Sequence, residues 1–312
     1  MHKVARFLTG ILLSALVCAS APIASAGDMG FDVPVADCPS TVVVVARGND
    51  SRDSVTPVRY SPQSDFVSTG WEGENIRTFL QFAENRHAAA NQGQSLLADT
   101  YVLGLSEEYY PADVSIPEVT DAADLGAVLP QLGGLVTDTV SGLKNSLDVS
   151  IPGIRTAIEN YETSSGCTPG YILIGYSLGA TVLSFQESWL AEKGQLVGTL
   201  YLGSVHQSPG DPAVIGAIAS AGGVLGRLPY NSLETARSPN RIMYCIPDDV
   251  ACDPTPTAVQ RAVDEASDSP HAQYFLDPES EVHIGEVADR FSSWIVEEHG
   301  KPAHPAGQQT IH

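Results

Sequence analysis

The six residues from Thr41 to Ala46, TVVVVA, form an uninterrupted run of β-branched and small apolar side chains. A strand of this composition has no polar face, so it belongs inside a parallel sheet that is covered on both sides. Further short apolar runs predict strands of the same kind at residues 100–105, 171–174, 198–202 and 241–244. The chain should therefore fold around a central, mainly parallel, five-stranded sheet.

Helical patterns separate these predicted strands. Apolar side chains recur at helical spacing in residues 74–85, 151–161 and 284–295, and residues 180–193 predict a further helix that Gly194 closes. Strands that alternate with helices indicate βαβ units. We therefore expect an α/β fold with three layers, α/β/α, in which functional sites form at the carboxyl ends of the strands.

Residues 1–26 have the pattern of a secretory signal peptide. A positively charged start and a short apolar run precede Ala24-Ser25-Ala26, which provides an A-x-A cleavage site. No later stretch offers the run of about 18 apolar residues that a transmembrane helix needs. We therefore expect an exported protein with one α/β domain at residues 27–298, a disordered tail at residues 299–312 and no transmembrane segment.

The charge of the chain limits its partners. Lys and Arg together number 16 against 37 Asp and Glu, which gives a formal net charge of −21. A field of this sign repels nucleic acid and anionic membranes. Nucleic-acid binding is therefore excluded.

The cysteines predict disulfides. Four of them follow the signal peptide, namely Cys38, Cys167, Cys245 and Cys252. An even number in an exported chain predicts two bridges, for which three pairings are possible. Neither a Cys-x-x-Cys motif nor a pair of histidines accompanies them, so no metal site is expected.

Ser177 is the candidate nucleophile. It is the central residue of GYSLG at residues 175–179, between the predicted strand at 171–174 and the predicted helix at 180–193. In this context, G-x-S-x-G is typical of a tight turn that raises the serine hydroxyl above the sheet and aims the next backbone N–H at a developing oxyanion. The alternative is a structural serine between two glycines, which the strand before it and the helix after it disfavour.

A serine nucleophile needs a carboxylate and then a histidine further along the chain. Asp248 and Asp249 both follow the predicted strand at 241–244, so a carboxylate is available there. His271 lies in the loop before the last predicted helix, whereas His283 lies where that helix begins and is interpreted as a solvated side chain. The remaining downstream histidines are at or beyond the end of that helix: His299, His304 and His312. Position alone leaves a catalytic and a surface role equally open for His271.

Several motifs together resemble those of the cutinase family of secreted serine esterases. Cys38-Pro39 precedes VVVVARGND, Cys167 precedes GYSLGA, and Cys-x3-Asp-x2-Cys and His-x-x-Tyr follow in that order. They span most of residues 38–294. The resemblance implies an α/β-hydrolase fold in residues 27–298, a carboxylic-ester hydrolase activity and no cofactor.

The same resemblance assigns roles to individual residues. It implies the disulfides Cys38–Cys167 and Cys245–Cys252, and it selects Asp249 over Asp248 as the catalytic aspartate. It also implies that His271 is the general base. The backbone N–H groups of Leu178 and Asn49 would form the oxyanion hole, although Asn49 stands where the family usually has serine or threonine.

The expected substrate is a lipid, a polyester or an acylated polysaccharide, and the expected location is outside the cell, with attachment to the cell wall left open. One alternative is an acyltransferase or mycolate-ester enzyme of the cell envelope, because the same triad serves both reactions. Another is an inactive, wall-associated binding protein, which should lack a triad residue.

The apolar segments 125–141 and 212–226 are interpreted as short helices that cover the core or, alternatively, as the lining of a groove for longer acyl chains.

Overall fold

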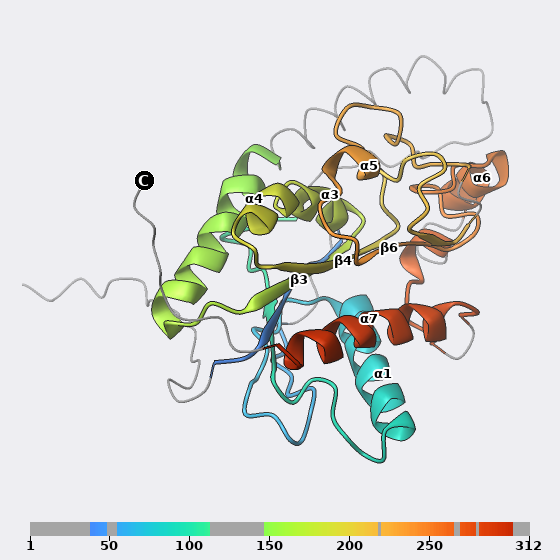
Figure 1. Cartoon of the computed structure of the whole chain (residues 1–312). Coiled ribbons are helices and arrows are strands. Elements are labelled where there is room, and N and C mark those ends of the chain that lie inside the picture. The colour runs from blue at the N-terminus through green and yellow to red at the C-terminus, as the bar shows by residue number, and fades with distance from the viewer. Residues whose placement is uncertain are drawn as a thin grey trace, which may run out of the picture. The chain divides into compact units, whose positions relative to one another are not determined.

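A central sheet organises the structure, a computed structural model that describes residues 38–48, 55–112, 147–217, 220–264, 269–278 and 281–301. The sheet has six strands in the order β2-β1-β3-β4-β6-β5, and each neighbouring pair is parallel. Three neighbouring strands, β3, β4 and β6, are labelled in Figure 1. The strands are β1 (Thr41–Ala46), β2 (Thr100–Gly104), β3 (Gly170–Tyr176), β4 (Leu196–Leu202), β5 (Val214–Gly216) and β6 (Arg241–Cys245). The five predicted strands are all present, and β5 is an additional strand at the edge of the sheet.

Strand β5 changes the interpretation of the apolar segment 212–226. The described part of this segment forms β5 and turns, so the expected core-covering helices are wrong here. Ile215 of β5 is buried against β6, whereas the side chain of Val224 is 53% exposed. The segment therefore changes from an edge strand to surface loop within a few residues. Segment 125–141 lies outside the described residues.

Helices flank the sheet. They are α1 (Glu74–Ala90), α3 (Leu178–Ser184), α4 (Glu187–Glu192), α5 (Ser232–Thr235), α6 (Pro256–Asp264), the 3-10 helix η1 (Pro270–Ala272), α7 (Ile284–His299) and the described part of a helix at residues 147–165. The single helix expected at 180–193 is thus two helices, α3 and α4, separated by Phe185 and Gln186. Gly194 follows α4 with a φ of 69°, as expected for a glycine that ends a helix. Among the described residues, no helix has both the length and the apolar character to cross a bilayer.

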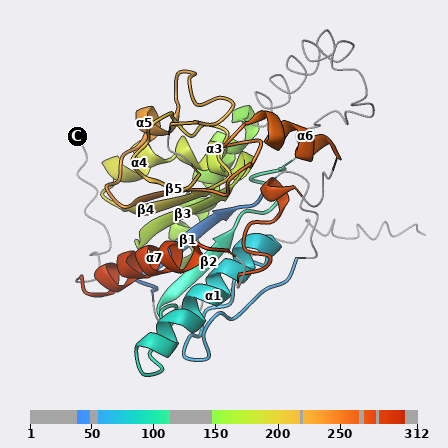
Figure 2. The ribbon, with the colours of Figure 1, turned by 90° about the vertical axis from the view of Figure 1, so that its right-hand side faces the viewer.

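Alternate side chains of the strands enter two separate cores. Val43 and Val45 of β1 pack on one face of the sheet with apolar residues of α1 and α7. Val42 and Val44 pack on the opposite face with residues of α3, α4 and the helix at 147–165. Figure 2 shows α1 and α7 on one side of the sheet and α3 and α4 on the other. The sheet is therefore the middle layer of a three-layer α/β/α fold, as its apolar strands predict.

The register of the strands brings their carboxyl ends to one edge. Ala46 pairs with Gly175, Tyr176 pairs with Leu202, and Leu202 pairs with Tyr244. The loops that follow β1, β3, β4 and β6 therefore begin side by side, with Ser177 directly after β3 and Asp249 in the loop after β6.

Two disulfides join segments that the fold brings together. Cys38–Cys167 connects the segments just before β1 and β3 across a sequence separation of 129, and Cys245–Cys252 closes the loop after β6. These are the two bridges that the family resemblance implies. The second one encloses both Asp248 and Asp249.

The buried residue Glu187 makes the stability of the fold depend on pH. Its carboxylate accepts hydrogen bonds from the Tyr201 hydroxyl (3.0 Å) and from the backbone N–H of Arg237 (2.9 Å). Burial nevertheless raises the pKa of Glu187 to about 7. Between the ordinary pKa and this value, the folded chain retains a proton that the unfolded chain has released, so the free energy of unfolding falls as the pH rises.

Replacing Glu187 with glutamine should remove this pH dependence. As the pH rises from about 4.5 to 7, the free energy of unfolding of the wild type should fall relative to that of Glu187→Gln by on the order of 3 kcal/mol. Above pH 7 the difference between the two free energies should stay constant. Denaturant unfolding of both proteins at pH 5 and pH 8 measures this difference. Glu192→Gln, an exposed position in the same helix, is the control. A wild-type-minus-variant difference that does not change with pH would contradict the prediction.

Candidate active site

Ser177 occupies a strained turn between β3 and α3. Its φ and ψ are 54° and −115°, a left-handed conformation that residues other than glycine rarely adopt. The backbone N–H of Ser177 donates to the carbonyl of Leu202 in β4 (2.8 Å), which ties the turn to the carboxyl edge of the sheet. A strained serine at this edge, between a strand and a helix, is the geometry that G-x-S-x-G predicts.

Both glycines of the GYSLG segment are required by close packing. A Cβ atom on Gly179 would lie 2.1 Å from the carbonyl oxygen of Ala46, at the end of β1. A Cβ atom on Gly175 would lie 2.5 Å from the backbone of Ala180. Any side chain at either position would therefore push helix α3 away from the strands. The two glycines allow the helix to begin directly above the sheet.

His271 and Asp249 come together at Ser177. The Nε2 atom of His271 lies 2.9 Å from Ser177 Oγ, and its Nδ1 atom lies 2.8 Å from Asp249 Oδ1. Asp249 is fully buried, and the backbone N–H of Ala251 donates to the same Oδ1 atom (2.7 Å). The imidazole is thus placed to accept the hydroxyl proton of Ser177 while the carboxylate holds its other nitrogen.

Gly203 makes room for this pair. It follows β4 with a φ of 54°, and a Cβ atom there would lie 2.8 Å from Asp249 Oδ2 and 3.0 Å from His271 Cε1. A larger residue would displace the carboxylate or the imidazole. No sequence pattern marks Gly203 as a site residue, because its role depends on loops from other strands.

The alternative residues considered from the sequence lie elsewhere. The Asp248 carboxylate accepts a hydrogen bond from Thr255 Oγ1 (3.1 Å) and pairs with Arg261 (3.4 Å). His283 precedes α7, where its side chain is 40% exposed and lies 3.9 Å from Glu286. Of the two aspartates and the two histidines compared, His271 contacts Ser177 and Asp249 contacts His271.

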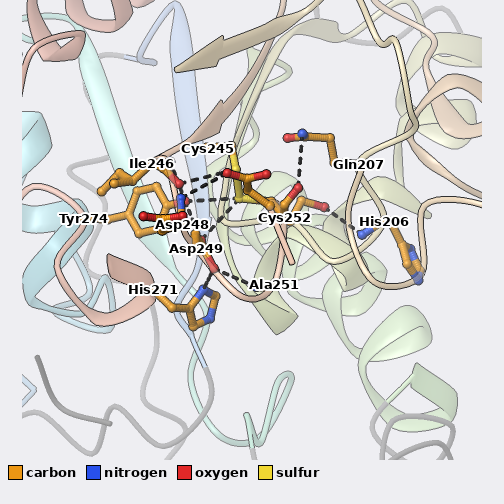
Figure 3. Close-up of a disulfide and its surroundings, with 12 residues drawn as sticks. His206, Gln207, Cys245, Ile246, Asp248, Asp249, Ala251, Cys252, His271 and Tyr274 are labelled. Carbon is orange, nitrogen blue, oxygen red and sulfur yellow. Dashed lines mark hydrogen bonds and ion pairs between the residues drawn. A yellow bond between two sulfur atoms is a disulfide. The ribbon is translucent and has the colours of Figure 1, made fainter. Parts of the chain in front are cut away.

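Three polar side chains that we did not predict hold the loop that carries His271. The Tyr176 hydroxyl donates to the backbone carbonyl of His271, and Asn75 Nδ2 donates to the carbonyl of Tyr274 (2.5 Å). The Tyr274 hydroxyl donates to Asp249 Oδ2 (2.5 Å). Figure 3 shows His271 and Tyr274 both meeting Asp249 within the loop that the Cys245–Cys252 disulfide closes. Tyr274 belongs to the His-x-x-Tyr motif, which was a usable signal, whereas nothing in the sequence marks Asn75.

The proposed oxyanion donors are described only in part. Leu178 is the first residue of α3, where backbone N–H groups have no intrahelical acceptor. Asn49 lies outside the described residues. Just before it, buried Arg47 donates to the Leu105 carbonyl (3.0 Å), and its guanidinium lies 5.2 Å from the centroid of the Trp71 ring. Arg47 therefore fixes the chain where it leaves β1.

Among the residues that the structure describes, no group of three or more His, Cys, Asp or Glu side chains is placed to hold a metal ion. The four cysteines considered as ligands are paired with each other in disulfides.

Comparison with solved structures finds esterases. A cutinase-like protein from Cryptococcus sp. is 16% identical, with a TM-score of 0.46, and the match covers 85% of this chain and 98% of that one. An acetyl xylan esterase is 14% identical, with a TM-score of 0.45 and coverage of 83% and 100%. A Trichoderma reesei cutinase in complex with a C11Y4 phosphonate inhibitor is 14% identical, with a TM-score of 0.36 and coverage of 85% and 78%. No protein-family model and no curated protein matches the chain. Cutinases are thus among the similar structures, as the sequence motifs led us to expect.

Proposed function

We propose that this protein is a secreted serine carboxylic-ester hydrolase that acts on lipid or polyester-type esters through Ser177, His271 and Asp249. The observation that carries the proposal is the chain of two contacts, 2.9 Å from Ser177 Oγ to His271 Nε2 and 2.8 Å from His271 Nδ1 to Asp249 Oδ1. Serine is a weak nucleophile unless an adjacent base removes its proton. The strained turn places that serine at the sheet edge where such a base is available.

The reaction proceeds in two acyl-transfer steps. His271 takes the hydroxyl proton of Ser177 as the oxygen attacks the ester carbonyl, and it returns the proton to the leaving alcohol as the acyl-enzyme forms. Water then attacks the acyl-enzyme while His271 takes its proton. The bond between Ser177 Oγ and the acyl carbon breaks, the carboxylic acid leaves, and His271 returns the proton to Ser177 Oγ. Asp249 orients the imidazole and stabilises its charged form, and the backbone N–H groups of Leu178 and Asn49 hold the oxyanion.

Export is part of the proposal. Residues 1–26 act as the signal peptide, and the mature enzyme works outside the cell. The disulfides Cys38–Cys167 and Cys245–Cys252 support this, because such bridges persist in oxidising compartments.

The loop after β5 supports a preference for longer acyl chains. It contacts the loops after β6 and β4, since Val224 N donates to the carbonyl of Ala251 (3.0 Å) and Leu225 N donates to that of Val205 (2.8 Å). Large apolar side chains are exposed along the same segment, with Val224 53%, Leu228 51% and Tyr230 65% exposed. Apolar surface beside the loop that carries Asp249 favours binding of an alkyl chain.

A series of p-nitrophenyl esters from acetate to laurate tests both parts of the proposal. We expect the purified protein to hydrolyse them, with the largest kcat/KM at a chain longer than acetate. Failure to hydrolyse any ester faster than a heat-denatured sample would contradict the esterase function. A maximum at acetate would contradict only the preference for longer chains.

A further inference from the structure

We propose that Tyr274 is a positioning residue whose hydroxyl holds Asp249 in place and partly offsets the charge that this carboxylate presents to His271. The inference rests on the proposed function, because it concerns the same Ser177–His271–Asp249 site. It assigns a role to the tyrosine of the His-x-x-Tyr motif, which the two-step mechanism itself does not use.

The hydrogen bonds of the Tyr274 hydroxyl fix its direction. Its oxygen accepts from the backbone N–H of Ile246 (3.1 Å), a group that can only donate. Its proton is therefore left for Asp249 Oδ2, at 2.5 Å. The two carboxylate oxygens have separate partners as a result, since Oδ1 faces His271 Nδ1 and the N–H of Ala251. With both oxygens held, the carboxylate cannot rotate away from the imidazole.

The surroundings keep Tyr274 neutral and immobile. The side chain is fully buried, and burial followed by the charge of Asp249 raises the pKa of Tyr274 well above its ordinary value. Its ring lies 5.6 Å from the Tyr176 ring and 5.6 Å from the Tyr244 ring, measured between centroids. Asn75 holds its backbone carbonyl. The phenol therefore donates its proton over the whole pH range in which the enzyme works.

Donation to Asp249 has a predictable electrostatic consequence. A hydrogen bond to a carboxylate stabilises its charge and reduces its attraction for a neighbouring cation. Besides Tyr274 itself, the ionisable groups that face His271 among the described residues are Asp249 from the loop after β6 and Tyr176 from β3. Asp248 and Asp253 lie in the Asp249 loop, where Asp248 N donates to the Asp253 carboxylate (3.0 Å). A substitution at Tyr274 leaves all four of these groups in place. Removing only the hydroxyl of Tyr274 should therefore make the charged imidazole easier to form.

The test is the pH dependence of kcat/KM for p-nitrophenyl ester hydrolysis by Tyr274→Phe. We expect kcat/KM at the optimum to fall about tenfold or more, because a hydrogen bond to a charged group is lost. The acidic limb of the profile should move to higher pH, since the base is protonated more readily. Circular dichroism establishes that the variant is folded at the assay temperature.

Tyr244→Phe is the matched control. It removes one hydroxyl from the same aromatic cluster, but the Tyr244 hydroxyl donates to Glu281 (2.7 Å) and not to Asp249. Its acidic limb should coincide with that of the wild type. If the acidic limb of Tyr274→Phe stays where it is in the wild type, the inference is overturned and Tyr274 has a purely structural role. This holds both when Tyr274→Phe keeps full activity and when the two variants lose activity equally.

A second replacement covers the case in which Tyr274→Phe does not fold. Site-specific replacement of Tyr274 by 3-fluorotyrosine keeps the shape of the ring and makes the hydroxyl a stronger donor. The acidic limb should then move to lower pH, and no movement or an upward movement would overturn the inference. The activity of Ser177→Ala separates failure of this inference from failure of the proposed function. If Ser177→Ala is inactive and the Tyr274 variants do not shift the acidic limb, only the role of Tyr274 is wrong. If Ser177→Ala is active, the proposed function itself is wrong.

Discussion

Replacing Ser177 with alanine should lower kcat for ester hydrolysis by roughly 10,000-fold to a million-fold while the protein remains folded. The reason is geometric, because Ser177 Oγ is the atom that His271 Nε2 faces at 2.9 Å. Without that oxygen the imidazole has no proton to accept and no acyl-enzyme can form. The measurement is the hydrolysis rate of a soluble p-nitrophenyl ester, together with thermal unfolding of both proteins.

Ser184→Ala is the matched control for this variant. Ser184 lies at the other end of α3, and its hydroxyl donates to the Thr181 carbonyl (2.8 Å) within the helix. We expect this variant to retain wild-type activity. If Ser177→Ala were as active as Ser184→Ala, the hydrolysis would have to come from another group and Ser177 would not be the nucleophile.

Replacing Asp249 with asparagine should lower kcat by about 10,000-fold at neutral pH, with little change in the fold. Asparagine has nearly the same shape, but its amide can donate a proton to His271 Nδ1. The imidazole would then carry its own proton on Nε2, the nitrogen that must accept from Ser177. The substitution would also remove the negative charge of Asp249, which stabilises the imidazolium.

The neighbouring residue offers a close control for the aspartate. Asp248→Asn makes the same chemical change one residue away, in a carboxylate that faces Thr255 and Arg261. The φ of Asp248 is 64°, a conformation that asparagine tolerates well. Activity close to that of the wild type is expected. Equal losses in the two variants would mean that the charge of the loop matters and not the contact of Asp249 with His271.

The parts of the fold that the sequence predicts are those with strong local signals. Strand β1 is recognisable because all six of its residues are buried, and its apolar run has no polar face. Strand β5 was missed because it has three residues inside a longer apolar segment, so neither its length nor its periodicity identifies it. The break between α3 and α4 was missed for a similar reason, since Phe185 and Gln186 include neither glycine nor proline.

In the candidate site, too, contacts between residues close in the sequence could be predicted, and contacts between residues far apart in the sequence could not. The turn at Ser177 could be predicted because its glycines and its flanking strand and helix are adjacent in the sequence. The resemblance to cutinases led to Asp249 and His271, and in the structure His271 contacts Ser177 while Asp249 contacts His271. The contact between Asn75 and Tyr274 joins residues 199 positions apart, so it exists only once α1 and the loop before α7 have packed together. No local pattern could predict it.

Covalent labelling with an organophosphonate tests the central claim most directly, because the reagent reacts with an activated serine and stays attached. Mass spectrometry of the intact protein should show one adduct per chain, and peptide mapping should locate it on Ser177. Ser177→Ala should remain unlabelled under the same conditions. An adduct on another residue, or labelling of Ser177→Ala to the wild-type extent, would contradict the assignment of Ser177 as the nucleophile.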